Sequence, residues 1–189
     1  MSEYLHLKDT TSNPGPLGLM GFALTTILLN IHNAGFFPID TMIMGMGIFF
    51  GGLAQFCAGI MEWKKGNMFG NVAFMSYGAF WLSLVFIWIG VDAFGLTKPD
   101  GISMGCYLFM WGLFTLVFFL QTLNGKTIGK LLFFSLFVLF MLLATYNFTG
   151  NAIIGKIAGF EGILCGFLAF YEAAAIMIND KYGREILPM

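Results

Sequence analysis

Six apolar runs, each close to the length that crosses a lipid bilayer, make up most of this chain of 189 residues. A membrane-spanning helix needs about 20 mostly apolar residues. Only 10% of the residues are charged and 58% are hydrophobic, whereas a soluble domain usually has about 25% charged residues. We therefore expect an all-α polytopic membrane protein. Its expected spans are Leu17–Ile31, Pro38–Met61, Phe69–Val91, Ile102–Leu123, Gly129–Phe148 and Ile153–Ile178.

The linkers between these runs are short and rich in turn formers, so no soluble domain fits between them. The predicted organisation is an N-terminal segment over 1–16, a six-helix transmembrane domain over 17–178 and a C-terminal tail over 179–189. The first twelve residues are polar and lack an apolar core, which predicts no cleaved signal peptide.

Basic residues predict the orientation, because Lys and Arg are retained on the cytoplasmic side. With both termini inside the cell, only Lys98 and Lys156 lie outside. We therefore expect a multi-pass cell-membrane protein with cytoplasmic N- and C-termini. The residues then placed inside are Lys8, Lys64, Lys65, Lys126, Lys130, Lys181 and Arg184.

Several function classes are excluded by what the sequence lacks. It has no GxSxG, HExxH, GxGxxG or P-loop motif, so we predict no enzyme. Cys57, Cys106 and Cys165 lie in apolar runs without CxxC spacing, and with only two histidines we expect no metal or other cofactor. The net charge is -1 and no basic tract is present, which argues against nucleic acid as a partner.

Hydrogen-bonding side chains run along one face of the first span. Threonine can bond its own helix backbone, but an asparagine amide finds no partner in hydrocarbon. This face must therefore meet protein or water. Its members, three and four positions apart, are Phe22, Thr26, Asn30 and Asn33, with Thr25 beside them.

Later spans repeat this arrangement of polar or amphipathic groups on one face. Two interpretations stay open: hydrogen bonds that hold a helix bundle together, or a polar pathway through it. Because no metal, redox or nucleophile constellation accompanies these faces, we favour the pathway. The faces are Gly52, Gln55 and Gly59; Phe74, Tyr77 and Trp81; and Tyr107, Trp111 and Thr115.

The chain contains 25 glycines, and Gly45, Gly52 and Gly59 follow one another at seven-residue steps. Small residues let helix backbones approach closely in lipid. This pattern predicts tight packing within or between protomers.

Acidic residues inside apolar runs need a separate explanation. Glu161 and Glu172 are eleven residues apart, which is three helical turns, so they share a face of the last span. A charge near the middle of a bilayer costs about 2.5–3.5 kcal/mol. A transport role and pairing at an oligomer interface both stay open. Glu62 and His32 lie at span ends, where an interfacial position is expected.

The sequence resembles the acetate uptake transporters, a family that includes the succinate–acetate permeases. "NPGPLGL" is similar to the NPAPLGL signature of that family, with Gly15 in place of alanine. The likeness covers nearly the whole chain. It continues through "GFALTTILLNIHNAG", "GIFFGGLAQFCAGIMEWKKGNMFG", "SYGAFWLSL", "WGLFTL", "FFSLFVLF", "GNAIIG" and "YGREILP".

This resemblance implies six helices around a central pore in each protomer, a hexameric assembly and acetate or another small carboxylate as substrate. By motif, it implies a hydrophobic pore constriction formed by Phe22, Tyr77 and Leu136. The candidate substrate-binding residues along the polar stripe are Thr25, Thr26, Asn30 and Gln55.

The expected function is thus acetate transport, with succinate as a further substrate, through an anion channel or a proton-coupled symporter. A channel for urea, an amide or ammonium is the alternative within transport. A structural or signalling membrane protein is the alternative from another class. The sequence decides neither between channel and symporter nor between uptake and efflux, and it gives Glu161 and Glu172 no role.

Overall fold

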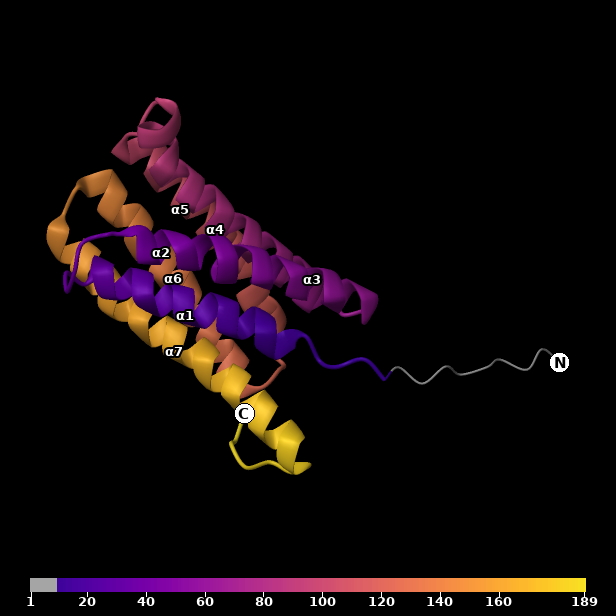
Figure 1. Cartoon of the computed structure of the whole chain (residues 1–189). Coiled ribbons are helices and arrows are strands. Elements are labelled where there is room, and N and C mark those ends of the chain that lie inside the picture. The colour runs from indigo at the N-terminus through magenta and orange to yellow at the C-terminus, as the bar shows by residue number, and fades with distance from the viewer. Residues whose placement is uncertain (1–9) are drawn as a thin grey trace.

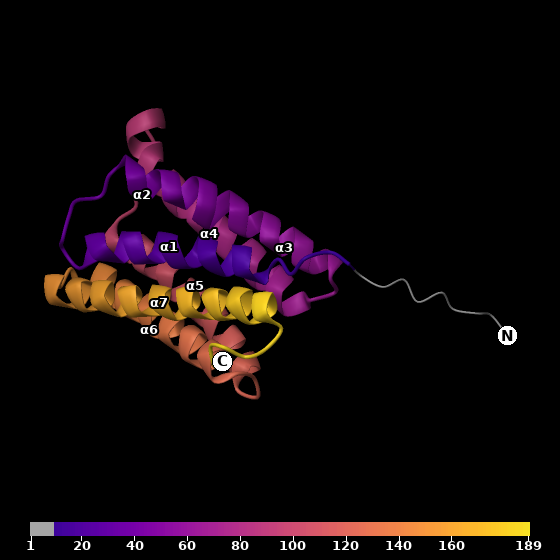
Figure 2. The same ribbon diagram turned by 60° about the horizontal axis from the view of Figure 1, so that its bottom comes forward.

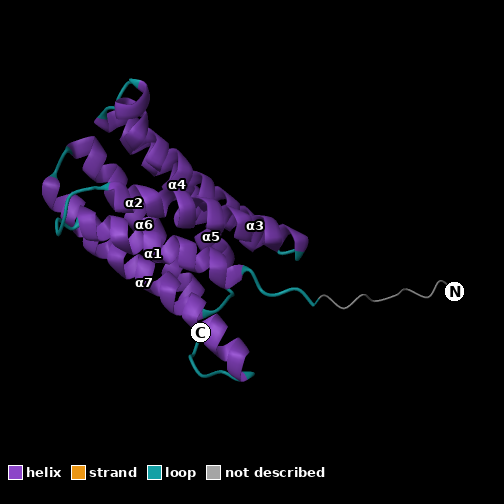
Figure 3. Cartoon of the chain, in the orientation of Figure 1, coloured by secondary structure: helices purple, strands orange, loops and turns teal. Residues whose placement is uncertain are grey.

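The computed structural model describes residues 10–189, which are helical with short connecting loops (Figure 3). Within that range six stretches are long and apolar enough to cross a membrane, which confirms the six predicted spans. Their ends lie within a few residues of the predicted ones. The helices are α1 (Gly15–Asn33), α2 (Thr41–Met46), the π-helix η1 (Gly47–Ala54), α3 (Gln55–Lys64), α4 (Met68–Phe94), α5 (Gly101–Thr122), α6 (Thr127–Thr149) and α7 (Ala152–Tyr182).

The second span is one continuous rod built from α2, η1 and α3. Its middle part over Gly47–Ala54 has π-helical hydrogen bonding, in which each amide reaches five residues back instead of four. Nothing in the sequence pattern predicted this wider winding.

The linkers end the helices by specific caps. The side chains of four residues accept hydrogen bonds from the first turn of the helix that follows, and three glycines with positive φ close helix C-termini. The N-caps are Asp40, Asn67, Asp100 and Asn151, and the C-caps are Gly95, Gly150 and Gly183.

The spans pack as a closed ring in the order α1, α7, α6, α5, α4 and the α2–η1–α3 rod, which returns to α1. Figures 1 and 2 show α1 between α7 and this rod, and the start of α1 near the end of α7. Backbones approach closely around the ring except between α4 and α5, which meet through large aromatic side chains.

Glycines make the close approaches possible, as the sequence predicted. A Cβ at Gly78 of α4 would lie 2.9 Å from the Phe56 amide nitrogen and 3.0 Å from the Gly52 carbonyl oxygen. Of the three glycines at seven-residue steps, Gly52 and Gly59 pack against α4, while a Cβ at Gly45 would meet no other part of residues 10–189 within 4 Å.

The interior of the ring is filled by apolar and aromatic side chains. Phe80 contacts the rings of Tyr107, Trp111 and Phe140, so it joins α4 to both α5 and α6. This aromatic packing positions the residues described next.

Candidate functional site

The three residues predicted as a constriction are all buried, each on a different helix. Phe22 is 7% exposed, Tyr77 3% and Leu136 3%, and all three belong to one buried cluster. The ring centroids of Phe22 and Tyr77 are 6.1 Å apart at an interplanar angle of 56°.

The hydroxyl of Tyr77 forms a hydrogen bond of 2.9 Å with Thr115 Oγ1. Thr115 Oγ1 in turn donates to the carbonyl of Trp111 at 2.8 Å. Because a threonine hydroxyl has one proton, Thr115 must accept from Tyr77. The Tyr77 proton is therefore already engaged, and its oxygen lone pairs are what remain for a substrate.

Two of the four candidate ligands have their polar groups engaged in hydrogen bonds, Thr25 across to the second span and Asn30 within α1. The Thr25 hydroxyl donates to the Met46 carbonyl at 3.4 Å, where α2 passes into η1. A threonine at such a point can satisfy backbone groups that a change in helix winding leaves free.

Asn30 is engaged in a similar way, on the side of α1 that faces α7. Its Nδ2 donates to the Thr26 carbonyl at 2.9 Å, and its Oδ1 accepts from Asn33 Nδ2 at 3.0 Å. Gly162 of α7 lies directly against this amide, where a Cβ would collide with it. The predicted polar face thus meets protein here.

The other two candidates, Thr26 and Gln55, have unused hydrogen-bonding capacity. Both are buried, at 2% and 1% exposure, and Thr26 Oγ1 and Gln55 Oε1 have no partner. In residues 10–189 the other buried side-chain polar atoms without a partner are Trp81 Nε1 and Glu161 Oε2. Such atoms are uncommon in folded proteins and ask for an explanation.

Two polar pairs were not found from the sequence. Ser83 Oγ and Tyr107 Oη lie 2.6 Å apart between α4 and α5, and Ser135 Oγ donates to Glu161 Oε1 at 2.5 Å between α6 and α7. Serine is common in apolar helices as a backbone-bonding residue, so neither serine gave a signal in the sequence.

The residues expected at span ends lie at helix ends. Glu62 is near the end of α3, where it is 4% exposed and its Oε2 accepts from Asn67 Nδ2 at 2.8 Å. His32 Nδ1 lies 2.8 Å from the Phe37 carbonyl oxygen just after α1. Both contacts are local and hold the turns that follow these helices.

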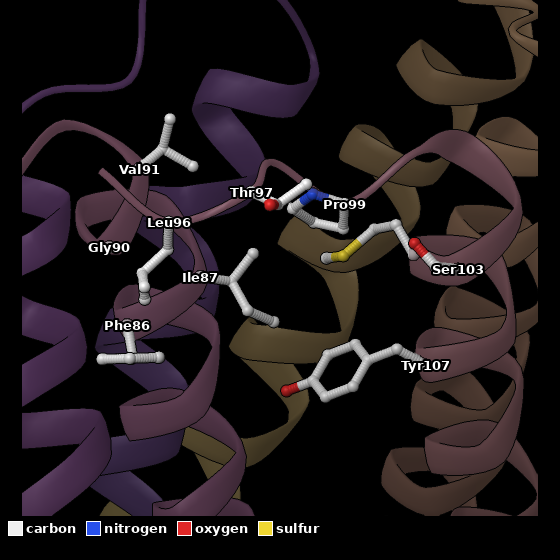
Figure 4. Close-up of a pocket in the computed structure, with 10 residues that line it drawn as sticks. Phe86, Ile87, Gly90, Val91, Leu96, Thr97, Pro99, Ser103 and Tyr107 are labelled. Atoms are coloured by element: carbon white, nitrogen blue, oxygen red, sulfur yellow. The ribbon is translucent and has the colours of Figure 1, made fainter. Parts of the chain in front are cut away.

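A cavity of about 290 Å³ opens where α4 ends and α5 begins, on the side away from the chain termini. Figure 4 shows Ile87 and Tyr107 facing each other across it, below the loop that carries Thr97 and Pro99. Its lining is mostly apolar. At its inner edge, the Tyr107 hydroxyl forms the bond to Ser83.

Three comparisons relate this chain to known proteins. A profile of the GPR1/FUN34/yaaH family matches residues 3–184. The succinate-acetate/proton symporter SatP of Escherichia coli K12 is 52% identical over 179 residues, which cover 94% of this chain and 95% of that protein.

The ammonia transport outward protein 2 of Saccharomyces cerevisiae is 41% identical, over 87% of this chain and 61% of the yeast protein. Among solved structures, one described as the bacterial acetate channel SatP matches with a TM-score of 0.94 and 50% identity. That match covers 95% of this chain and 99% of the other.

Proposed function

Because this chain belongs to the GPR1/FUN34/yaaH family, we propose that it transports acetate, and also succinate, across the cell membrane. It is a transporter or channel and not an enzyme. The likeness to two SatP proteins extends over at least 94% of the chain. The proposed substrate of the protein is a small carboxylate, and the protein is embedded in the lipid bilayer.

The observation that supports the pathway is that Phe22 and Tyr77 contact each other and share one buried apolar cluster with Leu136. We propose that they form a dry constriction, in its closed arrangement here. A carboxylate that passes it must give up water, and protein donors have to replace part of that hydration shell. Weak sites in series favour passage over trapping.

We propose that Thr25, Thr26, Asn30 and Gln55 line the path to this constriction. The unengaged hydroxyl of Thr26 can donate to a carboxylate, which supports direct contact with the substrate. The free atom of Gln55 is Oε1, an acceptor, so Gln55 would have to present its Nε2 amide to the substrate instead. Thr25 and Asn30 would have to exchange an existing bond, so their contribution is expected to be smaller.

Phe22→Ala tests the constriction. Removal of this ring should raise acetate flux in proteoliposomes, and raise succinate flux further because the dianion is larger. A buried Phe→Ala change costs about 3–5 kcal/mol of stability, so assembly is checked first by gel filtration. Phe49→Ala is the matched control, since Phe49 is 68% exposed on the outside of the ring. Unchanged flux in Phe22→Ala would remove this residue from the constriction.

Channel and symporter are separated by a counterflow assay with labelled acetate in liposomes. It is run at two pH values, with and without a proton ionophore. Since carboxylic acids titrate at about pH 4–5, faster uptake at low pH alone would fit both mechanisms. Uptake driven by a pH gradient and abolished by the ionophore, after subtraction of protein-free liposomes, would favour the symporter.

We further propose a hexamer with both termini in the cytoplasm. The resemblance described above supports the hexamer, and the seven basic residues against two support the orientation. Gly45, which is open within the chain, offers room for a neighbouring protomer. Native mass spectrometry would measure the number of subunits, and labelling of single-cysteine variants in intact cells would report the orientation. One of the basic residues, Lys8, lies outside the described residues.

Ammonium is the second candidate substrate, because the yeast relative is named as an ammonia transport protein. Competition of labelled acetate uptake by ammonium, urea and acetamide would decide between them. Competition by succinate alone supports the carboxylate pathway.

A further inference from the structure

Glu161 brings a carboxyl group into the interface between α7 and α6, which lie side by side in Figure 2. Its Oε1 accepts a hydrogen bond from Ser135 Oγ, and its Oε2 is buried without any partner. The residue as a whole is half-buried. Its carboxyl group therefore points into the protein.

This carboxyl group lies at the level of the proposed constriction. Ser135 directly precedes Leu136 on α6. Cys165, one turn after Glu161 on α7, is fully buried. The hydrogen bond from Ser135, the residue before Leu136, thus places Glu161 beside the level of Leu136.

Among residues 10–189, the hydrogen-bond partner of the Glu161 carboxyl group is the neutral Ser135 and not a positively charged side chain. The helices packed against α7 present the neutral Ser135 from α6 and the neutral Asn30 amide from α1.

The other charged groups of α7 lie away from this level. Lys156 is exposed and near Gly35 at the opposite end from the termini. Glu172 lies three turns further along α7, close to Gly129 and in electrostatic contact with Lys126. An ionised Glu161 would thus keep an uncompensated negative charge beside the path.

We propose that Glu161 is a specificity-determining residue of the pathway, which lets carboxylates pass when it holds a proton and repels them when it is ionised. The proposal rests on the acetate pathway proposed above. Repulsion acts on each charge of the substrate, so succinate dianion is held back more than acetate. The residue thereby links conduction to pH and favours monoanions.

The magnitude follows from Coulomb's law. For two unit charges about 8 Å apart at an effective dielectric constant of about 20, the repulsion corresponds to a roughly 30-fold lower rate. The factor for a dianion is roughly the square of this.

The test compares wild type, Glu161→Gln and the matched control Glu172→Gln in proteoliposomes. Initial rates of labelled acetate and succinate uptake are measured at about pH 6 and about pH 8, where acetate is almost wholly ionised. The pH is equal on both sides of the liposome membrane, so that no proton gradient drives transport. The rates of protein-free liposomes are subtracted.

Wild type and Glu172→Gln should lose acetate flux between the lower and the higher pH, by up to roughly 30-fold. Glu161→Gln should show a flat profile and a higher succinate-to-acetate ratio at the higher pH. A flat wild-type profile, or the same profile and ratio in Glu161→Gln as in wild type, would overturn the proposal. Wild type that carries no acetate at either pH would instead refute the acetate pathway.

Ser135→Ala provides a second test if Glu161→Gln does not fold. Loss of the donor to Oε1 destabilises the ionised carboxylate, so the fall in flux should move to higher pH. An unmoved profile in a folded Ser135→Ala variant would also overturn the proposal.

Discussion

The direction of the hydrogen bond between Tyr77 and Thr115 can be tested by a double-mutant cycle. Thr115 donates to the Trp111 carbonyl, so it accepts from Tyr77. In Tyr77→Phe, Thr115 keeps its donor bond and loses only a donor to its oxygen. Side-chain hydrogen bonds inside membrane proteins are worth about 0.6 kcal/mol on average and about 1.7 kcal/mol at most. We expect Tyr77→Phe to lower the free energy of unfolding by an amount within that range.

Thr115→Val should cost more, although it conserves the shape of the side chain. It leaves the buried Tyr77 hydroxyl without an acceptor, and a stranded buried donor costs about 1–3 kcal/mol. The double variant removes both groups, so its loss of unfolding free energy should be close to that of Tyr77→Phe alone. The difference from additivity is then about 0.5–3 kcal/mol.

The measurement is reversible unfolding in mixed micelles with increasing SDS, followed by tryptophan fluorescence for the four proteins of the cycle. Circular dichroism before unfolding checks that each variant has wild-type helix content. Two results would refute the assigned direction: Thr115→Val no more destabilising than Tyr77→Phe, or a double variant whose loss equals the sum of the single losses.

Three further predictions concern packing, capping and the tail. Gly78→Ala, whose Cβ would meet backbone atoms 2.9 and 3.0 Å away, should cost about 1–3 kcal/mol and lower the SDS midpoint; a midpoint equal to that of wild type would contradict the packing. Hydrogen bonds from Ser103, its backbone amide first, lower the pKa of the exposed N-cap Asp100. The ionised Asp100 side chain therefore adds stability to the folded protein above the unfolded pKa of about 3.9, and this stability is lost as pH falls through the folded pKa. Asp100→Ala should consequently lower the melting temperature at neutral pH but not at low pH. Asn179→Ala removes three hydrogen bonds to residues 186–187 and should speed proteolysis of the tail; wild-type cleavage rates would contradict this role.

The number and position of the spans were predictable because length and apolarity decide them. Hydrocarbon forces every backbone group into internal hydrogen bonds, so an apolar run of sufficient length has one structural solution. The linker residues Asp100 and Gly150 likewise cap helices for local reasons that a sequence shows directly.

The partner of each polar side chain was not predictable in the same way. Thr25 and Asn30 stand on the predicted polar face, yet one meets the α2–η1 junction and the other meets α7. Those contacts depend on helix rotation and on the π winding of η1. The Ser135–Glu161 bond joins residues 26 positions apart, and its existence depends on how α6 and α7 are placed.

The π-helical winding of Gly47–Ala54 also has a consequence for how chains of this architecture tolerate changes in length. Each wide turn stores an additional residue, so loss of one residue there can be absorbed when the winding tightens into ordinary α-helix. The flanking parts of the rod then keep their faces toward α1 and α4. The α-helices α4 and α6 hold no additional residue of this kind. A single-residue deletion there rotates the rest of the helix by about 100° about its axis. Single-residue gaps between homologous sequences should therefore gather in this stretch of the second span.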